Sequence, residues 1–264
     1  MKKKAVAVVM TAVMALGMVS AVSVQAGIED KTLIVGFDAE YPPYGYMDEN
    51  GEYTGFDLEL AQAVCDLEGW ELEKKPINWD SKDMELNSGS IDCIWNGFTM
   101  NGREDDYTFS EPYVDNSQVI VVADDSGIEK LTDLAGKTVG VQAASAALDL
   151  LQSEEEGGQK ELADTFGALN EFADYNTAFT ELQAGALDAL AIDVGVAKYQ
   201  LNSRGEGFKI LDETLNTEQY AIGFKKGNTE LCDIVNADLQ KLADDGTVAE
   251  LAEQLSLIHI CRCR

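Results

Sequence analysis

Short apolar runs that are typical of buried strands recur along the chain between residues 31 and 254. Each is five or six residues long, too short for a helix of ordinary length. Their positions are 33–37, 91–95, 119–123, 138–142, 187–192 and 220–224. The sequence therefore predicts six strands spread over the whole chain.

Amphipathic patterns with apolar residues three and four apart separate these runs and predict helices. Asp57 is predicted to cap the first helix, and Ser145 to open a helix over 146–151. Gly185 is predicted to end a third helix, and residues 229–254 form a last helical region. Strands separated by helices predict an α/β fold with largely parallel sheets.

The chain is long enough for more than one folded unit. It has 264 residues, of which 27–254 form the continuous strand and helix pattern. No long linker rich in Pro, Gly or Ser divides this region, and no internal repeat is present. Its size predicts two lobes, without showing where the chain crosses between them.

Composition and charge describe a globular, strongly acidic protein. Apolar residues make up 45% of the chain, and 19 Lys and Arg stand against 48 Asp and Glu. Five of the basic residues lie in the two end segments, so the region between them carries 14 basic and 48 acidic residues, a net charge of −34. Such a surface repels phosphate backbones, which excludes nucleic acid as a partner.

Candidate catalytic and metal-binding side chains are few. The single histidine is His259, near the C-terminal end, so neither imidazole catalysis nor a histidine-based metal site is expected. Cys65, Cys93 and Cys232 are an odd number with apolar neighbours, which predicts buried free thiols rather than disulfides. The sequence predicts no metal and no cofactor.

The N-terminal segment has the pattern of a secretory signal peptide. Basic residues 2–4 precede an apolar stretch over 5–24, which closes with small residues at Val24 and Ala26. Cleavage after Ala26 is expected, giving an exported protein of the periplasm or cell surface. An uncleaved membrane anchor is the alternative, because the stretch approaches the length that spans a bilayer. No cysteine follows it, so a lipid anchor is not predicted.

The C-terminal decapeptide LSLIHICRCR, residues 255–264, differs abruptly from the acidic helix before it. It resembles the translation of a sequencing adapter, and we expect it to be non-native. A natural tail is the alternative.

Six segments along the chain resemble the family-three solute-binding proteins that serve ABC importers of polar amino acids. They are GFDAEYPPYGY (36–46), GEYTGFDLELAQAV (51–64), IDCIWNGFTMNGREDDYTFSEPY (91–113), DLAGKTVGVQAASA (133–146), LQAGALDALAIDVGVA (182–197) and YAIGFKKGN (220–228). Their order and spacing carry the resemblance over essentially the whole region after the signal segment.

The resemblance implies two α/β lobes joined by two crossing strands, with the ligand in the cleft between the lobes. Lobe one would comprise 27–115 plus 219–254, and lobe two 116–218. It also implies a monomer that captures a free amino acid by hinge closure and delivers it to a permease in the membrane.

The resemblance assigns the ligand's carboxylate to a loop after the second predicted strand. The arginine that grips this carboxylate in the family matches Arg103, whose planar guanidinium suits the task. Thr99 would donate its hydroxyl or its backbone N–H to the same carboxylate, at the turn that begins with Asn96 and Gly97. Thr99 and Arg103 are four apart here, where many relatives have five. An ion pair of Arg103 with Glu104 or Asp106 is the alternative.

The family's other cleft residues match positions after further predicted strands. Asp193 would accept from the ligand's ammonium group, with a plain helix cap as the alternative. Tyr41 and Phe56 match the aromatic pair that covers the ligand, with core packing as the alternative. Tyr220 is expected in the hinge or core rather than at the ligand.

In the second lobe, Gln142, Ser145 and Ala146 lie where a helix begins, and its free N–H groups suit a carboxylate. Relatives usually carry Gly at Ala144 and Thr or Ser at Ala146.

Asp38 matches a position that often faces the ligand's side chain. Arg103 and Asp193 would pair with the ligand's own carboxylate and ammonium, so the Asp38 carboxylate has no counter-charge. This predicts a ligand with a polar or cationic side chain, and it predicts that glutamate and aspartate are rejected. The alternative is that Asp38 only bonds nearby backbone N–H groups.

Two other functions remain open from the sequence. An exported dehydratase on the same fold would need an acid or base in the cleft, for which Asp38, Glu40 or Asp193 could serve. The retained Arg103 and Asp193 pair favours a binding protein over an enzyme. A sensor ectodomain is the third possibility.

Overall fold

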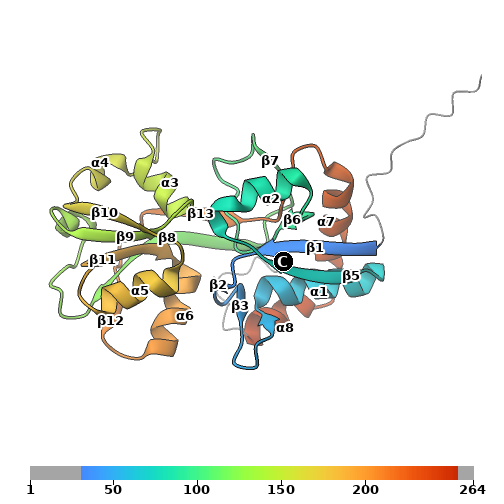
Figure 1. Cartoon of the computed structure of the whole chain (residues 1–264), viewed down its shortest axis with the longest axis horizontal. Helices are drawn as coiled ribbons and strands as arrows, with labels where there is room; N and C mark the ends of the chain where they lie inside the picture. The colour runs from blue at the N-terminus through green and yellow to red at the C-terminus, as the bar shows by residue number, and fades with distance from the viewer. Residues whose placement is uncertain (1–30, 255–264) are drawn as a thin grey trace, which may run out of the picture.

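The computed structural model describes residues 31–254. The predicted signal peptide, 1–26, and the predicted non-native tail, 255–264, lie outside the described residues. Two β-sheets, each with its own helices, form two lobes that lie side by side along the long axis of the molecule (Figure 1). No helix within residues 31–254 is long and apolar enough to cross a membrane.

The first lobe is built on a five-stranded sheet with the order β5-β1-β6-β14-β7. These strands are β1 (Thr32–Phe37), β5 (Glu71–Pro76), β6 (Cys93–Ile94), β7 (Tyr107–Phe109) and β14 (Gly223–Lys225). Its helices are α1 (Phe56–Glu68), α2 (Lys82–Ser88), α7 (Thr229–Asp244) and α8 (Thr247–Gln254), with a 3-10 turn η2 (Trp79–Ser81) before α2. A small sheet of β2 (Glu40–Tyr41), β3 (Gly45–Met47) and β4 (Tyr53–Thr54) faces the other lobe (Figure 1).

The second lobe is built on a sheet with the order β10-β9-β11-β8-β12, in which β13 also pairs with β8. Its strands are β8 (Val114–Ala123), β9 (Thr138–Gln142), β10 (Ala168–Phe172), β11 (Ala189–Asp193), β12 (Phe208–Ile210) and β13 (Asn216–Tyr220). The helices are α3 (Ala146–Gln152), α4 (Lys160–Ala163), α5 (Tyr175–Gln183) and α6 (Val194–Arg204), with a 3-10 turn η3 (Leu131–Leu134).

Two antiparallel strands connect the lobes. The chain leaves the first lobe along β8, a ten-residue strand, and returns along β13. Their register places Asn216 opposite Gln118 and Tyr220 opposite Val114. In Figure 1, β8 extends from the centre of the molecule into the second lobe. The predicted architecture of two lobes joined by crossing strands is therefore confirmed.

Several local predictions were wrong. The sheets are mixed, because only β1, β5 and β6 in one lobe and β9, β10 and β11 in the other pair in parallel. The single strand expected over 220–224 is two strands, since β13 ends at Tyr220 and β14 begins at Gly223. The last helical region is broken by Gly246, whose φ of 93° belongs to the left-handed region that favours glycine.

Asp57 does not cap the first helix. Gly55 holds the cap position, and Asp57 lies inside α1, where its buried carboxylate accepts from the N–H of Gly97. Ser145 does cap α3, as predicted, because its Oγ accepts from Leu148 N at 3.2 Å.

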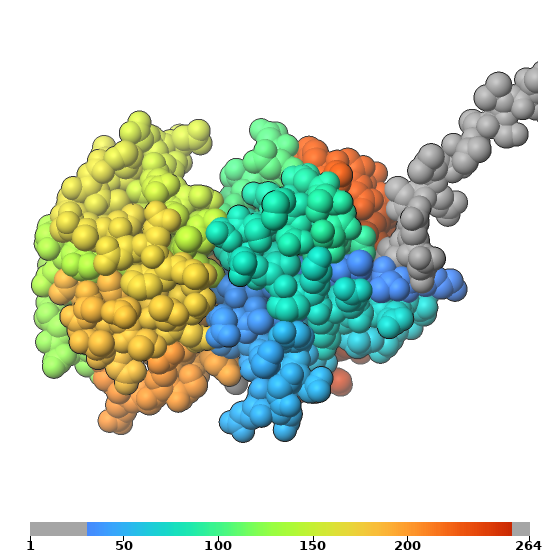
Figure 2. Space-filling view, viewed as in Figure 1, coloured from blue at the N-terminus to red at the C-terminus, as the bar shows by residue number. Residues whose placement is uncertain are grey.

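The hydrophobic core continues across the junction of the lobes. Tyr41 and Tyr44 from the first lobe pack near Tyr175 and Tyr220, with ring centroids 5.2–6.0 Å apart for the contacting pairs. Figure 2 shows the two lobes in contact at the middle of the molecule, with a notch between them at the top of the view. The three described cysteines are buried and free, as predicted: Cys65, Cys93 and Cys232.

Candidate functional site

A small cavity lies between the two lobes, beside the crossing strands. Its lining from the first lobe is Tyr41, Trp79, Gly97, Thr99 and Arg103, and from the second lobe Gln142, Ser145, Ala146 and Asp193. The ends of β2, β6, β9 and β11 meet here, so segments far apart in sequence contribute to one site. Ligands in α/β folds bind in such a place, outside the carboxyl ends of the strands.

Arg103 reaches from the first lobe toward α3 of the second. Its Nη2 lies 2.7 Å from Oδ2 of Asp149, and its Nη1 donates to the carbonyl of Thr99 at 3.3 Å. The guanidinium carbon lies 5.0 Å from the ring centre of Phe98, which supports it from one side. The alternative ion pair with Glu104 or Asp106 is not the one formed. Asp149, on the opposite lobe, is the partner.

Thr99 is held by the returning crossing strand. It forms a bridge with Tyr220, and its hydroxyl donates to Oε1 of Glu218 at 2.8 Å. A hydroxyl has one proton, so this hydroxyl can only accept from a group in the cavity. Of the two donors expected of Thr99, the hydroxyl is committed to Glu218, and the backbone N–H is the one left for a carboxylate.

Asp193 ends β11 and begins α6, but its side chain makes no capping hydrogen bond. Its Oδ1 accepts from Asn116 Nδ2 at 2.9 Å, Gln118 Nε2 at 2.6 Å and the Tyr220 hydroxyl at 2.6 Å. The simple helix cap is excluded, because three side-chain donors orient the carboxylate instead.

Gly97 lies beneath two tyrosines. Its φ is 55°, and a Cβ at this position would come within 2.9 Å of the Tyr220 ring and 3.0 Å of the Tyr41 ring. Glycine is thus required both by the backbone and by the close approach of these rings. The two tyrosine hydroxyls lie 3.2 Å apart. Tyr220 is fully buried at the junction, as expected of a hinge or core residue.

The turn from β9 into α3 forms the second-lobe wall. Gln142 Nε2 donates to Oδ2 of Asp38 at 2.7 Å, which links the two lobes. Ala144 has a φ of 54°, where a glycine would be relaxed, and its carbonyl accepts from Lys82 Nζ at 3.2 Å. Ala146 lines the cavity at the first turn of α3, as the sequence predicts.

Ser145 stabilises the start of α3. Its hydroxyl donates to the carbonyl of Gln142 at 2.7 Å and accepts from Leu148 N at 3.2 Å. We expect Ser145→Ala to lower the free energy of unfolding by about 1 kcal/mol, as loss of a helix cap does. Thermal unfolding would register a fall of about 2–4 °C in a chain of this size.

The control for this change is Ser203→Ala in the last turn of α6, where the hydroxyl only bonds the carbonyl of Gln200. That variant should stay within about 0.5 kcal/mol of the parent protein. Equal effects of the two substitutions would contradict the capping role of Ser145.

Two of the residues expected at the ligand are buried away from both the cavity and its surroundings between the lobes. Phe56 is fully buried at the start of α1 and stacks with Tyr113, with ring centroids 6.2 Å apart, so it belongs to the core of the first lobe. Asn96 is also buried and packs against Gly45. Neither lines the cavity between the lobes.

Trp79, which was not predicted from the sequence, supplies the second aromatic surface of the cavity. It belongs to the short 3-10 turn before α2, and Lys82 Nζ lies 5.3 Å from its ring. No local pattern marks it. Asn116 and Gln118 were missed too, because residues 115–118 are all polar and their sequence does not show which of them face inward.

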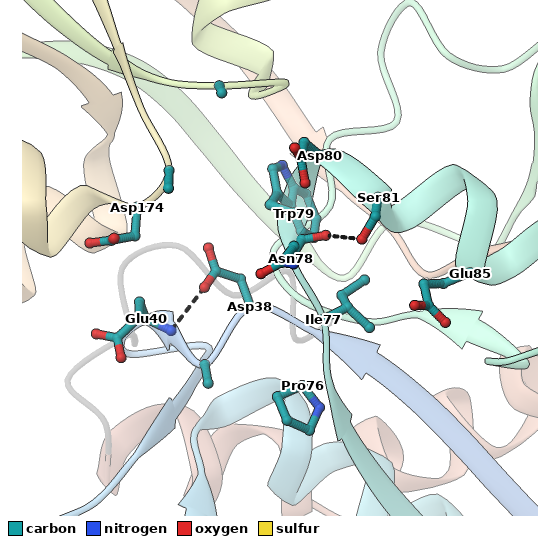
Figure 3. Close-up of a pocket in the computed structure, with 13 residues that line it drawn as sticks. Asp38, Glu40, Pro76, Ile77, Asn78, Trp79, Asp80, Ser81, Glu85 and Asp174 are labelled. Carbon is teal, nitrogen blue, oxygen red and sulfur yellow. Dashed lines mark hydrogen bonds between the residues drawn. The ribbon is translucent and has the colours of Figure 1, made fainter.

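A second, wider hollow adjoins the cavity and shares Trp79 with it. Its lining includes five carboxylates, those of Asp38, Glu40, Asp80, Glu85 and Asp174. Figure 3 shows Asp38, Glu40 and Asp174 gathered at one end of the hollow, with Glu85 at the other. Asp174 comes from the second lobe and the others from the first, so this hollow also lies between the lobes.

Asp38 lines this hollow rather than the smaller cavity. Its Oδ1 accepts from the backbone N–H of Glu40 at 2.9 Å, which is the local bond considered as the alternative, and its Oδ2 accepts from Gln142. Burial, with Asp174 and Glu40 nearby, raises the pKa of Asp38 to about 6. The carboxylate is therefore both a link between lobes and part of an acidic wall.

Residues 33–256 match the model of the bacterial extracellular solute-binding proteins, family 3. The chain belongs to this family. The arginine-binding extracellular protein ArtP of Bacillus subtilis is 34% identical over 85% of this chain and 86% of its own. The L-cystine-binding protein TcyJ of Escherichia coli K12 is 29% identical, over 92% of both chains.

Solved structures agree with the fold of this family 3 protein. A substrate-binding protein of an ABC uptake transporter from Streptococcus pneumoniae, determined with bound histidine, has a TM-score of 0.80 and 33% identity over 85% of this chain and 92% of its own. The family predicted from the sequence is therefore confirmed.

Proposed function

We propose that this family 3 protein captures a polar or cationic L-amino acid between its lobes and presents it to an ABC permease. The observation that carries the proposal is the pair of opposite charges from opposite lobes at one cavity, Arg103 and Asp193. Arginine-, cystine- and histidine-binding relatives support the amino-acid class.

Within this proposal Arg103 binds the ligand's carboxylate and Asp193 its ammonium. The N–H groups of Thr99 and of the first turn of α3 contribute further donors to the carboxylate, and Tyr41 and Trp79 exclude water from the two faces. A zwitterion joined to both lobes stabilises the state in which they touch, and this differential contact drives hinge closure.

The boundaries of the lobes belong to the same proposal. Residues 27–115 and 219–254 make lobe one and 116–218 make lobe two, with β8 and β13 as the hinge. The protein acts as an exported monomer after loss of residues 1–26, and it binds its ligand without converting it.

Charge in the wider hollow supports a cationic ligand side chain. A ligand side chain that extends from the small cavity past Trp79 enters the wider hollow, which is lined by five carboxylates. A cation is attracted there and a carboxylate is repelled. A thermal-shift screen of the twenty amino acids, cystine and ornithine tests this. Ligands of the folded state raise its unfolding temperature, and the proposal fails if none of the compounds does so.

Asp38→Asn tests the side-chain preference. In the parent protein we expect arginine to bind more tightly than glutamine, and glutamate to bind most weakly, because its side chain meets like charge. Removing the Asp38 charge should narrow the gap between arginine and glutamate by about tenfold, or about 1.4 kcal/mol. Calorimetry gives the three affinities.

The control for Asp38→Asn is Asp48→Asn, in the exposed turn between β3 and β4, whose carboxylate accepts from Asn50 and Glu52. This variant should keep the parent order of affinities. If Asp38→Asn keeps that order and spacing as well, Asp38 has no role in selecting the side chain.

A further inference from the structure

The returning crossing strand carries a buried carboxylate that the proposed ligand contacts do not use. Glu218 on β13 is 4% exposed, and its Oε1 accepts three hydrogen bonds of 2.8 Å. The donors are the hydroxyl of Thr99 and the side-chain amides of Asn116 and Gln118. Glu218 therefore contacts a residue of the ligand cavity and both inward-facing residues of the other crossing strand.

The same two amides also bind Asp193. Asn116 Nδ2 and Gln118 Nε2 donate to Oδ1 of Asp193 at 2.9 and 2.6 Å, so each amide bridges the two carboxylates. The remaining donors to the pair are the hydroxyls of Thr99 and Tyr220. All of these donors are neutral, so the hydrogen bonds orient two buried acids without supplying a positive charge.

Two ionised carboxylates held in this way repel each other in a site shielded from water. Burial and the Asp193 carboxylate raise the pKa of Glu218 to about 7. Tyr41 on β2, Tyr175 on α5 and Tyr220 on β13 face the pair, and burial raises the pKa of all three phenols, which keeps them neutral. Arg103, the cation of the cavity, is paired with Asp149.

We propose that Glu218 holds a proton in the ligand-free cleft, and that the ammonium group of an amino acid bound at Asp193 displaces this proton into the solvent. The inference rests on the proposed function, because it gives the ammonium to Asp193. The ammonium supplies the positive charge that the neutral donors lack, and this charge favours the ionised form of Glu218. Glu218 is then a positioning residue that couples ligand capture to proton release at the hinge.

The sign of the pH dependence follows from this exchange. Below pH 7 the ligand has to expel the proton, so affinity should fall by about tenfold for each pH unit between 7 and 5.5. Above pH 8 Glu218 is already ionised, and the affinity should be level until the ligand's own ammonium loses its proton.

The first measurement needs no ligand. A carboxyl whose pKa is raised by folding stabilises the folded state below its unfolded pKa, and this contribution is lost as pH rises through the folded pKa. Glu218→Gln keeps the acceptor oxygen and removes the titration. The unfolding temperatures of the two proteins should be similar at pH 5, and Glu218→Gln should be several degrees higher at pH 8. Parallel profiles from pH 5 to 8 would overturn the proton on Glu218.

The second measurement is calorimetry with L-arginine and L-glutamine at pH 6, in two buffers with different ionisation enthalpies. The parent protein should release about one proton with either amino acid, and Glu218→Gln close to none. Asp38→Asn is measured as well, because Asp38 also has a raised pKa and lines the adjoining hollow. The control is Asp48→Asn, in the exposed turn between β3 and β4, which should leave the proton release unchanged.

The outcomes separate the two proposals. Binding without proton release at pH 6 would overturn the role of Glu218 and leave amino-acid capture intact. Proton release that disappears in Asp38→Asn but persists in Glu218→Gln would assign the proton to Asp38 and also overturn it. If neither amino acid binds, capture of this ligand class fails, and the ligand-free profiles still decide whether Glu218 holds a proton.

Discussion

Replacing Arg103 by alanine is expected to weaken amino-acid binding by roughly a hundred- to a few-thousand-fold, or about 3–5 kcal/mol. The guanidinium is largely enclosed, with 13% of its side chain exposed, and Phe98 and the carbonyl of Thr99 fix its direction. Truncation leaves the ligand's carboxylate between the lobes without its counter-charge. The remaining N–H donors cannot replace a charge-assisted pair.

Calorimetry with arginine and glutamine measures the loss. Arg204→Ala is a matched control, since Arg204 lies over Phe179 at 5.2 Å as Arg103 lies over Phe98, but on α6 at the edge of the second lobe. It should change affinity less than threefold. An Arg103→Ala protein that also stays within about threefold would show that the ligand's carboxylate binds elsewhere.

A second comparison separates ligand binding from the link between lobes. Asp149 is the partner of Arg103 across the cleft, with 61% of its side chain exposed. Exposed ion pairs contribute about 0–1 kcal/mol, so Asp149→Asn should change affinity less than tenfold. If this variant reproduces the full loss of Arg103→Ala, Arg103 acts by holding the lobes together and not by binding the carboxylate.

Periodicity was sufficient for most of the architecture. The strand over 138–142 matches β9, and Ser145 followed by apolar residues locates the start of α3. The direction of the strands was harder to predict from the sequence. β8 is a long apolar strand like the others, yet it runs antiparallel to β11, because the chain has to cross to a second lobe and come back. The residues of β8 do not themselves indicate this path of the chain.

Residues of the site were predictable where a motif fixes them and not where packing does. Arg103, Thr99 and Asp193 line the cavity as the resemblance implied. Phe56 does not, because helix α1 begins with its side chain turned into the core beside Tyr113. A tryptophan from a short 3-10 turn takes the aromatic position instead, and such a turn has no periodicity that would reveal its direction.

Hydrogen bonds between polar side chains were the hardest feature to predict from the sequence. The sequence assigned Thr99 as a donor to the ligand, but its proton is committed to Glu218, 119 residues further along the chain. The link exists because β13 returns beside the loop that carries Thr99. Pairings of this kind follow from the crossing of the two strands and could be derived only after their register was known.

Asp193→Asn is expected to lower amino-acid affinity by roughly thirty- to several-thousand-fold, or about 2–5 kcal/mol, as truncation of a buried charged pair does. The substitution keeps the size of the side chain, but its amide replaces one carboxylate oxygen and the negative charge is lost. The donors from Asn116, Gln118 and Tyr220 then face a weaker acceptor.

Asp188→Asn provides the matched control, because Asp188 immediately precedes β11 while Asp193 ends it. Asp188 is half-exposed, accepts from Thr138 N at 2.8 Å and lies 3.7 Å from Lys137 Nζ. Calorimetry should find its affinity within threefold of the parent, since no part of it reaches the cavity. The two substitutions thus make the same chemical change at opposite ends of β11. A small effect of Asp193→Asn, equal to that of Asp188→Asn, would mean that Glu218 and not Asp193 carries the ammonium, because it is the other carboxylate that shares these donors.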